Sequence, residues 1–142
     1  MILDKHCGNL IKQIHDGMQK SANNDLRGRG LTVTQLNLLL SLYDSPDGEL
    51  SLKQLEQIMH VAQSTTAGIV SRLEQKSLLE SVPDPADKRI KLVRLTEAGK
   101  QCCIEMETQI DVAEAKLLSG LDENETRTLH DLLIRMAGNL QD

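Results

Sequence analysis

Three cysteines and four histidines are the side chains of this chain most suited to chemistry. Neither set has the spacing of a disulfide pair or of a metal site. Cys102 and Cys103 are adjacent on an expected helix, so they point about 100° apart and cannot easily pair with each other. No H-x3-H, C-x2-C or H-E-x-x-H spacing of metal sites occurs. There is also no phosphate-cradling glycine loop and no G-x-S-x-G motif. We therefore expect no metal, no cofactor and no enzyme activity. The histidines are His6, His15, His60 and His130.

Cys7 raises a separate hypothesis. If the first helix begins near Asp4, Cys7 lies in its first turn, where the helix dipole favours a thiolate. Cys7 is then either the thiol of a redox switch or a buried apolar side chain. Three cysteines without paired spacing are typical of reduced thiols, which predicts a cytoplasmic protein. No apolar run approaches the roughly 18 residues of a membrane helix.

The segment D-P-A-D-K-R at residues 84–89 has residue types suited to contacting a partner. Together with Pro83 before it, this segment places two prolines and two aspartates in one turn, and Lys88 and Arg89 follow them. Flanking β-rich runs predict strands at residues 78–82 and 90–95. Because the connection is too rich in proline for a tight two-residue turn, we expect a longer hairpin loop with two cations at its tip.

Amphipathic helices are expected to position this hairpin. Apolar residues recur at steps of three and four over residues 3–18, along a second helix that begins at Thr32, and along two helices after the hairpin. The first of these two is capped by Thr96. Three further pairs fit helix starts: Thr32 with Gln35, Ser51 with Gln54, and Asp122 with Glu125.

Two of the expected helices are short and closely spaced. One opens at Ser51, and the other covers residues 62–76 and begins with hydroxyls and amides. This pattern resembles a helix-turn-helix, although many helical hairpins share it. With the hairpin directly behind it, the pattern predicts a mainly α (α+β) winged helix-turn-helix over residues 31–99. Apolar stripes on the terminal helices exceed what one small winged domain covers, so residues 1–30 and 100–142 are expected to form a helical dimerisation region.

Composition and charge limit the kinds of partner that the chain can bind. The chain has no Phe, no Trp and one tyrosine, Tyr43, so the core must be aliphatic and base stacking on aromatic rings is excluded. The net charge is −5, but residues 61–100 carry +2 while residues 101–142 carry −6. Affinity for phosphate depends on local potential, so a DNA partner remains compatible with the acidic total.

The D-P-A-D-K-R segment, followed by L-T-E-A-G at residues 95–99, resembles the wing-to-helix signature of the MarR family of bacterial transcriptional regulators. L-T-V-T-Q at 31–35 and R-L-E-Q-K at 72–76 support the resemblance, which covers essentially the whole chain. It implies a homodimer of winged lobes on a shared helical base. Such a dimer binds a pseudo-palindromic double-stranded operator, most commonly as a ligand-responsive repressor.

The resemblance also implies which residues contact DNA. The fourth helix of the family enters the major groove, and the wing reaches the adjacent minor groove, where negative potential favours arginine. Arg72 would contact phosphate or brace the helix, and Asp87 would shape the wing tip and orient Arg89. The implied contact residues are Gln63, Ser64, Thr65, Thr66, Arg72, Asp87, Lys88 and Arg89.

Two further expectations follow from the family. An effector pocket between the winged lobe and the helical base would be lined here by Ile14, Met18, Leu39 and Tyr43. Relatives that sense peroxide have an N-terminal cysteine, which Cys7 resembles.

Three positions depart from the family pattern. Gly68 lies where a basic residue is frequent, Ala62 where a small polar cap is usual, and Ser77 where glycine is typical. A dimeric protein-interaction module that has lost DNA binding is therefore an alternative.

Overall fold

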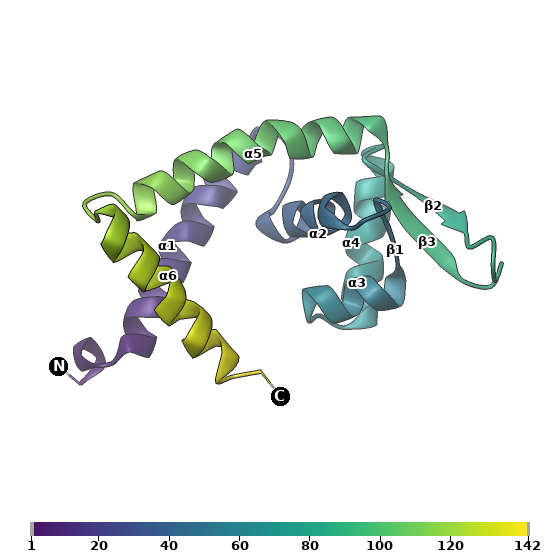
Figure 1. Cartoon of the computed structure of the whole chain (residues 1–142). Coiled ribbons are helices and arrows are strands. Elements are labelled where there is room, and N and C mark those ends of the chain that lie inside the picture. The colour runs from purple at the N-terminus through teal and green to yellow at the C-terminus, as the bar shows by residue number, and fades with distance from the viewer. Residues whose placement is uncertain (1, 142) are drawn as a thin grey trace. The chain divides into compact units, whose positions relative to one another are not determined.

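The structure is a computed structural model that describes residues 2–141, and it confirms a mainly helical fold with one small sheet (Figure 1). The chain divides into two compact units at residues 106 and 107, and each is described by itself. No helix among residues 2–141 has the length and apolar character needed to cross a membrane.

The first unit contains the predicted helix-turn-helix and its wing. Its elements are a 3₁₀ turn (Leu3–Lys5), α1 (Cys7–Arg27), α2 (Val33–Asp44), β1 (Glu49–Ser51), α3 (Leu52–Met59), α4 (Gln63–Gln75), β2 (Leu79–Pro83), β3 (Lys91–Leu95) and the beginning of α5 (Glu97–Leu117). The N-terminal helix begins at Cys7, later than the start expected near Asp4, because residues Leu3–Lys5 form the separate 3₁₀ turn, and it ends at Arg27 before Gly28 and Gly30.

The sheet has three antiparallel strands in the order β1-β3-β2. The β2–β3 hairpin is the predicted wing, with Leu79 opposite Leu95 and Pro83 opposite Lys91 (Figure 1). The three-residue strand β1 was not predicted, and it pairs Leu50 with Val93. Pairing on both sides of β3 ties the base of the wing to the chain segment that leads into α3.

Side-chain caps begin the helices where the sequence predicts them. Thr32 accepts a hydrogen bond from the Gln35 amide, and the Gln35 side chain accepts one from the Thr32 amide. Equivalent capping boxes open α3 and the last helix, α6 (Glu123–Gly138). Thr96 caps α5, because its hydroxyl oxygen lies 3.1 Å from the Gly99 amide. These bonds satisfy backbone donors that a helix start leaves unpaired.

An aliphatic core holds the first unit together, as the composition predicts. It is built from α1, α2, α3, α4, the sheet and the start of α5. The fully buried leucines are Leu26, Leu38, Leu39, Leu42, Leu55 and Leu73. Complete burial of such side chains stabilises a fold by roughly 1.5–3 kcal/mol each. The core therefore fixes α4 and the wing in one packed unit.

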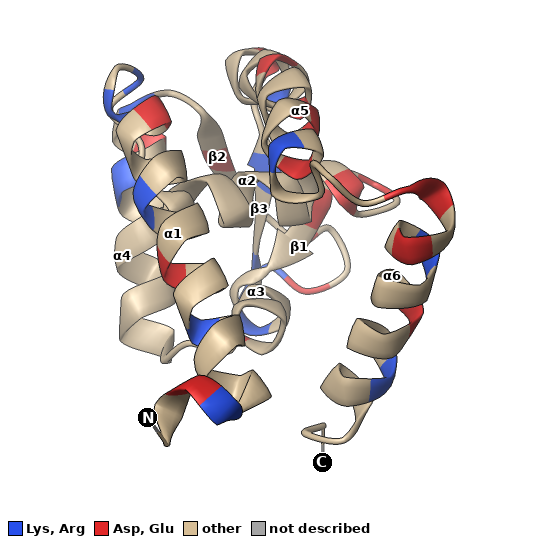
Figure 2. Ribbon diagram, turned by 90° about the vertical axis from the view of Figure 1, so that its left-hand side faces the viewer, with Lys and Arg blue, Asp and Glu red and all other residues tan. Residues whose placement is uncertain are grey.

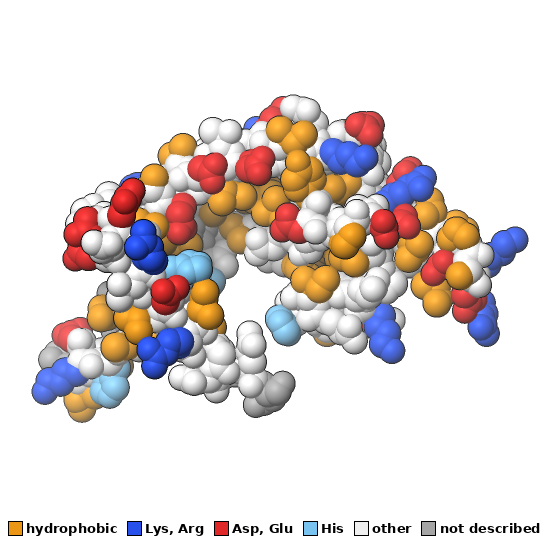
Figure 3. Space-filling model, viewed as in Figure 1, with side chains coloured by type: hydrophobic (Ala, Val, Ile, Leu, Met, Phe, Trp, Pro, Cys, Tyr) orange, Lys and Arg blue, Asp and Glu red, His pale blue; other side chains and the backbone are white. Residues whose placement is uncertain are grey.

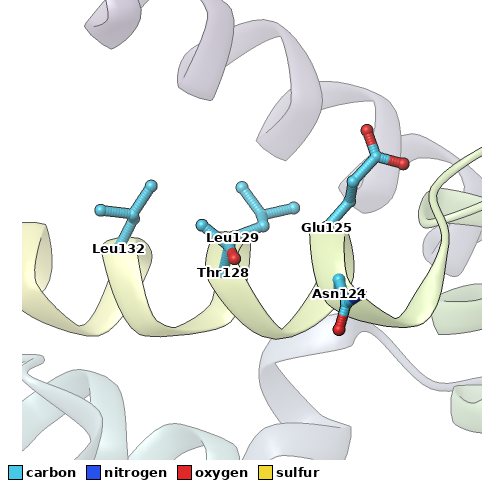
Figure 4. Close-up of a pocket in the computed structure, with 5 residues that line it drawn as sticks. All are labelled: Asn124, Glu125, Thr128, Leu129 and Leu132. Carbon is cyan, nitrogen blue, oxygen red and sulfur yellow. The ribbon is translucent and has the colours of Figure 1, made fainter.

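The second unit consists of the end of α5 and α6. None of the residues of α6 is buried: Leu129 is half-buried, and Leu132, Leu133, Ile134 and Met136 are between 39% and 58% exposed. An open depression along α6 is lined by Asn124, Glu125, Thr128, Leu129 and Leu132 (Figure 4). An apolar helix face with this much exposure is uncommon in a monomer.

Candidate nucleic-acid interface

The connection between α3 and α4 sets the direction of α4. His60 ends α3 in a left-handed conformation with φ 55°, and its amide donates to the Glu56 carbonyl. Ala62 then occupies the N-cap position of α4 without a side-chain cap bond. The backbone N–H groups in the first turn of α4 are therefore open to a partner.

Two faces of α4 have opposite character. Thr66, Ile69, Val70 and Leu73 are buried against the core. The exposed side of the helix holds Gln63, Ser64, Thr65, Ala67, Gly68, Ser71 and Arg72. Of the predicted contact residues on α4, four therefore share one exposed surface: Gln63, Ser64, Thr65 and Arg72.

Thr66 departs from its predicted role. Its side chain is completely buried, and its hydroxyl donates to the Ala62 carbonyl at 3.2 Å. A threonine in a helix can satisfy its hydroxyl with the carbonyl four residues earlier, so it needs no partner outside the fold. We therefore leave Thr66 out of the candidate interface.

The tip of the wing is a compact loop held by backbone bonds. The Asp84 amide donates to the Ile90 carbonyl at 2.8 Å, and the Ile90 amide donates to the Asp87 carbonyl at 2.9 Å. The Asp84 carboxylate accepts from the Ala86 amide at 2.9 Å. This is a local side-chain turn, the arrangement for which aspartate is favoured in loops.

Asp87 fixes the direction of Arg89. The Arg89 Nε and Nη2 donate to the two Asp87 carboxylate oxygens at 3.0 and 3.1 Å, and the Arg89 amide donates to Oδ1 at 3.1 Å. The side chain of Arg89, followed by its backbone amide, lowers the pKa of the Asp87 carboxyl. Arg89 nonetheless remains 90% exposed. The pair uses Nε and Nη2 and leaves Nη1 outside it, and basic side chains project at the tip (Figure 3).

Two contacts hold the loop between α1 and α2 against the rest of the unit. Arg29 forms an ion pair with Glu105 of α5 at 2.7 Å, which raises the pKa of Arg29 and lowers that of Glu105. The Lys76 ammonium, at the end of α4, donates to the Gly30 carbonyl. The far end of α4 is thereby connected to the end of α1.

Lys88 is exposed at the wing tip beside Arg89, whereas the four residues predicted to line an effector pocket do not join this surface. Leu39 is fully buried in the core, whereas Ile14, Met18 and Tyr43 are between 39% and 50% exposed. Two open depressions lie along and just before α6, and they are lined by none of these four residues. The effector pocket stays a prediction.

The three cysteines differ in accessibility. Cys7 is exposed at the first position of α1, whereas Cys102 and Cys103 are buried. Burial is the main reason that the pKa of Cys102 is raised and that the pKa of Cys103 is raised to about 11. Only Cys7 is therefore accessible as a thiol among the described residues, and its redox role stays a prediction. No cluster of three metal-binding side chains occurs within residues 2–141.

Comparisons with known proteins agree with this geometry. The profile of the MarR family matches residues 31–91, the segment that contains the helix-turn-helix and most of the wing. An HTH-type transcriptional regulator of Bacillus subtilis, YwaE, is 28% identical over 66% of this chain, and the matched region spans about half of YwaE.

Two solved structures share the fold over nearly the whole chain. A MarR family transcriptional regulator from Silicibacter pomeroyi is 28% identical, with a TM-score of 0.83 over 96% of this chain and 91% of that one. A mutant of MarR from E. coli, solved in complex with operator DNA, is 25% identical, with a TM-score of 0.80 over 91% of both chains.

Proposed function

We propose that this chain is a member of the MarR family and a sequence-specific, double-stranded DNA-binding transcriptional regulator, because the profile of that family matches residues 31–91 and a MarR family regulator shares the fold over nearly the whole chain. It acts as a homodimer on a pseudo-palindromic operator, and its output is ligand-responsive repression through occlusion of a promoter. An effector would act by binding more tightly to one spacing of the two lobes than to another.

The observation that carries this proposal is the clamped arginine at the wing tip. Asp87 holds Arg89 by two side-chain bonds while the guanidinium stays exposed. An arginine whose direction is already set loses less rotamer freedom when it enters a narrow minor groove. The polar start of α4 supplies the matching element for the major groove, and the same core holds both elements.

Homodimer formation is supported by apolar side chains that the chain leaves exposed. On α1 these are Leu10, Ile11, Ile14 and Met18, which are 42–50% exposed. On α5 and α6, Ile110, Leu117, Leu132 and Leu133 are 41–44% exposed. Their removal from water by a second copy would contribute roughly 25 cal/mol per Å² of apolar surface. Two winged lobes would then lie about one helical turn of DNA apart.

The test is a fluorescence-anisotropy titration against labelled duplex from upstream of the protein's own gene, repeated at several salt concentrations. We expect affinity to fall steeply with salt, because bound phosphates release counterions. Arg89→Ala should weaken binding by about tenfold and reduce the salt slope by about 1. Arg127→Ala, which removes the same charge from α6, is the matched control and should leave binding unchanged.

Absence of DNA binding would favour the alternative of a dimeric protein-interaction module. In that case the folded wild-type protein would bind neither this duplex nor any sequence from a random pool at low salt. Binding that is unaffected by Arg89→Ala would instead exclude the wing from the interface.

A further inference from the structure

Gly68 lies in the middle of α4, where a glycine destabilises a helix relative to alanine. The fold gives no reason for a glycine at this position. A Cβ atom built there meets no neighbouring atom within 4 Å, and Gly68 is not among the glycines with positive φ. An alanine would therefore fit within the chain itself, so packing inside the fold does not require glycine at this position.

Gly68 lies on the face of α4 that points away from the core. At about 100° per residue, Gly68 is opposite the buried positions Thr66, Ile69, Val70 and Leu73. Ser64 and Ser71 lie on the same outward line, one turn on either side, and both are exposed. The outermost line of α4 thus consists of a residue without a side chain between two short hydroxyl side chains.

This line also carries no charge. No Lys, Arg, Asp or Glu occurs from Gln63 to Ser71, and Figure 2 shows charged residues on α4 only near one end. A helix that holds DNA at a distance would use long basic side chains to bridge the gap. Short hydroxyls can contact base edges only if the helix backbone comes close to them.

We propose that Gly68 is the point of closest approach between α4 and the base edges of the operator, and that it determines sequence specificity by letting Ser64 and Ser71 reach the bases. The inference rests on the proposed DNA-binding function and deepens it. It assigns base readout to short hydroxyl contacts along α4, while Arg89 of the wing supplies attraction to the minor groove.

Gly68→Ala separates stability from binding, because its two effects have opposite signs. The added methyl group favours the helix, so the midpoint of thermal unfolding should rise. The same methyl group holds the backbone away from the bases, so affinity for the operator should fall about tenfold. Affinity for an unrelated duplex of equal length should stay within about twofold, since non-specific binding depends on phosphate contacts. Gly68→Leu should lower the affinity for the operator further.

Gly17→Ala is the matched control, because Gly17 also lies inside a helix with no neighbour within 4 Å of a built Cβ. It should raise the unfolding midpoint and leave operator affinity unchanged, with the dimer checked by light scattering. Equal or tighter operator binding by Gly68→Ala, while the wild type binds normally, would overturn the inference and leave the proposed function intact. A wild-type protein that binds no duplex at all would overturn both.

Discussion

Ser77, which follows α4, adopts a left-handed backbone conformation with φ 62°. This conformation costs an L-residue roughly 1–2 kcal/mol and costs glycine almost nothing. We expect Ser77→Gly to raise the free energy of unfolding by about 1 kcal/mol, measured by urea denaturation. The Ser77 carbonyl, which accepts the Thr96 hydroxyl at 2.7 Å, is kept in the variant.

Ser77→Ala is the control for the backbone effect, because alanine keeps the Cβ atom and its steric conflict. Its stability should stay close to that of the wild type. Equal stabilisation by both variants would show that the serine side chain, and not the backbone conformation, is the source of the effect.

The buried thiol of Cys103 makes stability depend on pH in the alkaline range. Burial raises its pKa from 9.0 to about 11 in the folded protein. The thiol is neutral in both states below pH 9, so its contribution is fully present there. Above pH 9 the unfolded chain ionises first, and the free energy of unfolding should fall by roughly 1–3 kcal/mol by pH 11.

Denaturant titrations at pH 8 and pH 10.5 measure this loss, with Cys103→Ala as the comparison. The variant should be less stable at pH 8, because it loses buried atoms. Its stability should then change less between the two pH values than that of the wild type. An identical pH dependence in both proteins would assign the loss to other groups.

At the scale of elements, Gly99 allows the first turn of α5 to pack directly on the start of the wing. A Cβ atom at this position would lie 2.2 Å from the Leu78 carbonyl oxygen and 3.1 Å from a methyl group of Leu95. The Leu78 carbonyl cannot easily move, because it accepts a hydrogen bond from the Thr96 amide at 3.1 Å.

Gly99→Ala should therefore lower the free energy of unfolding by about 3 kcal/mol, measured in urea. The matched change Gly17→Ala, in an open part of α1, should raise it by about 0.5–1 kcal/mol. A Gly99→Ala protein as stable as the wild type would mean that α5 and the wing can separate at no cost.

How well each element could be predicted depends on where its stabilising contacts lie in the sequence. The capping boxes at Thr32, Ser51 and Asp122 involve residues three positions apart, so local pattern is sufficient, and all three are confirmed. The wing strands were predicted within one residue, because their pattern and the proline-rich loop are also local.

Other features depend on how the elements pack together and could not be predicted. β1 is only three residues long and exists because it pairs with β3, more than 40 positions later. The family resemblance implied Thr66 as an interface residue, yet its side chain is buried and the Ala62 carbonyl accepts its hydroxyl. Composition alone cannot predict which polar group a fold buries.

At the scale of the whole molecule, the proposal requires two copies. Leu133 on α6 is 44% exposed, and a charge at an apolar dimer contact should prevent association. We expect the wild type to be a dimer by light scattering and Leu133→Glu to be a folded monomer that binds the operator at least tenfold more weakly.

Arg127→Glu also adds an acidic side chain to α6, at a position about 120° around the helix from Leu133, and should remain dimeric. A wild-type protein that is monomeric at micromolar concentration would contradict the shared helical base. A dimer that survives Leu133→Glu would place the interface elsewhere.

Selection of duplex DNA by the purified protein from a random-sequence pool tests directly whether the protein binds a specific sequence. We expect an enriched pseudo-palindrome whose two half-sites are centred about 10 base pairs apart, with each half-site contacted by one α4 and its wing. Enrichment should be lost with Arg89→Ala. Recovery of no common sequence by a folded wild-type dimer would contradict the conclusion that this chain is a sequence-specific DNA-binding regulator.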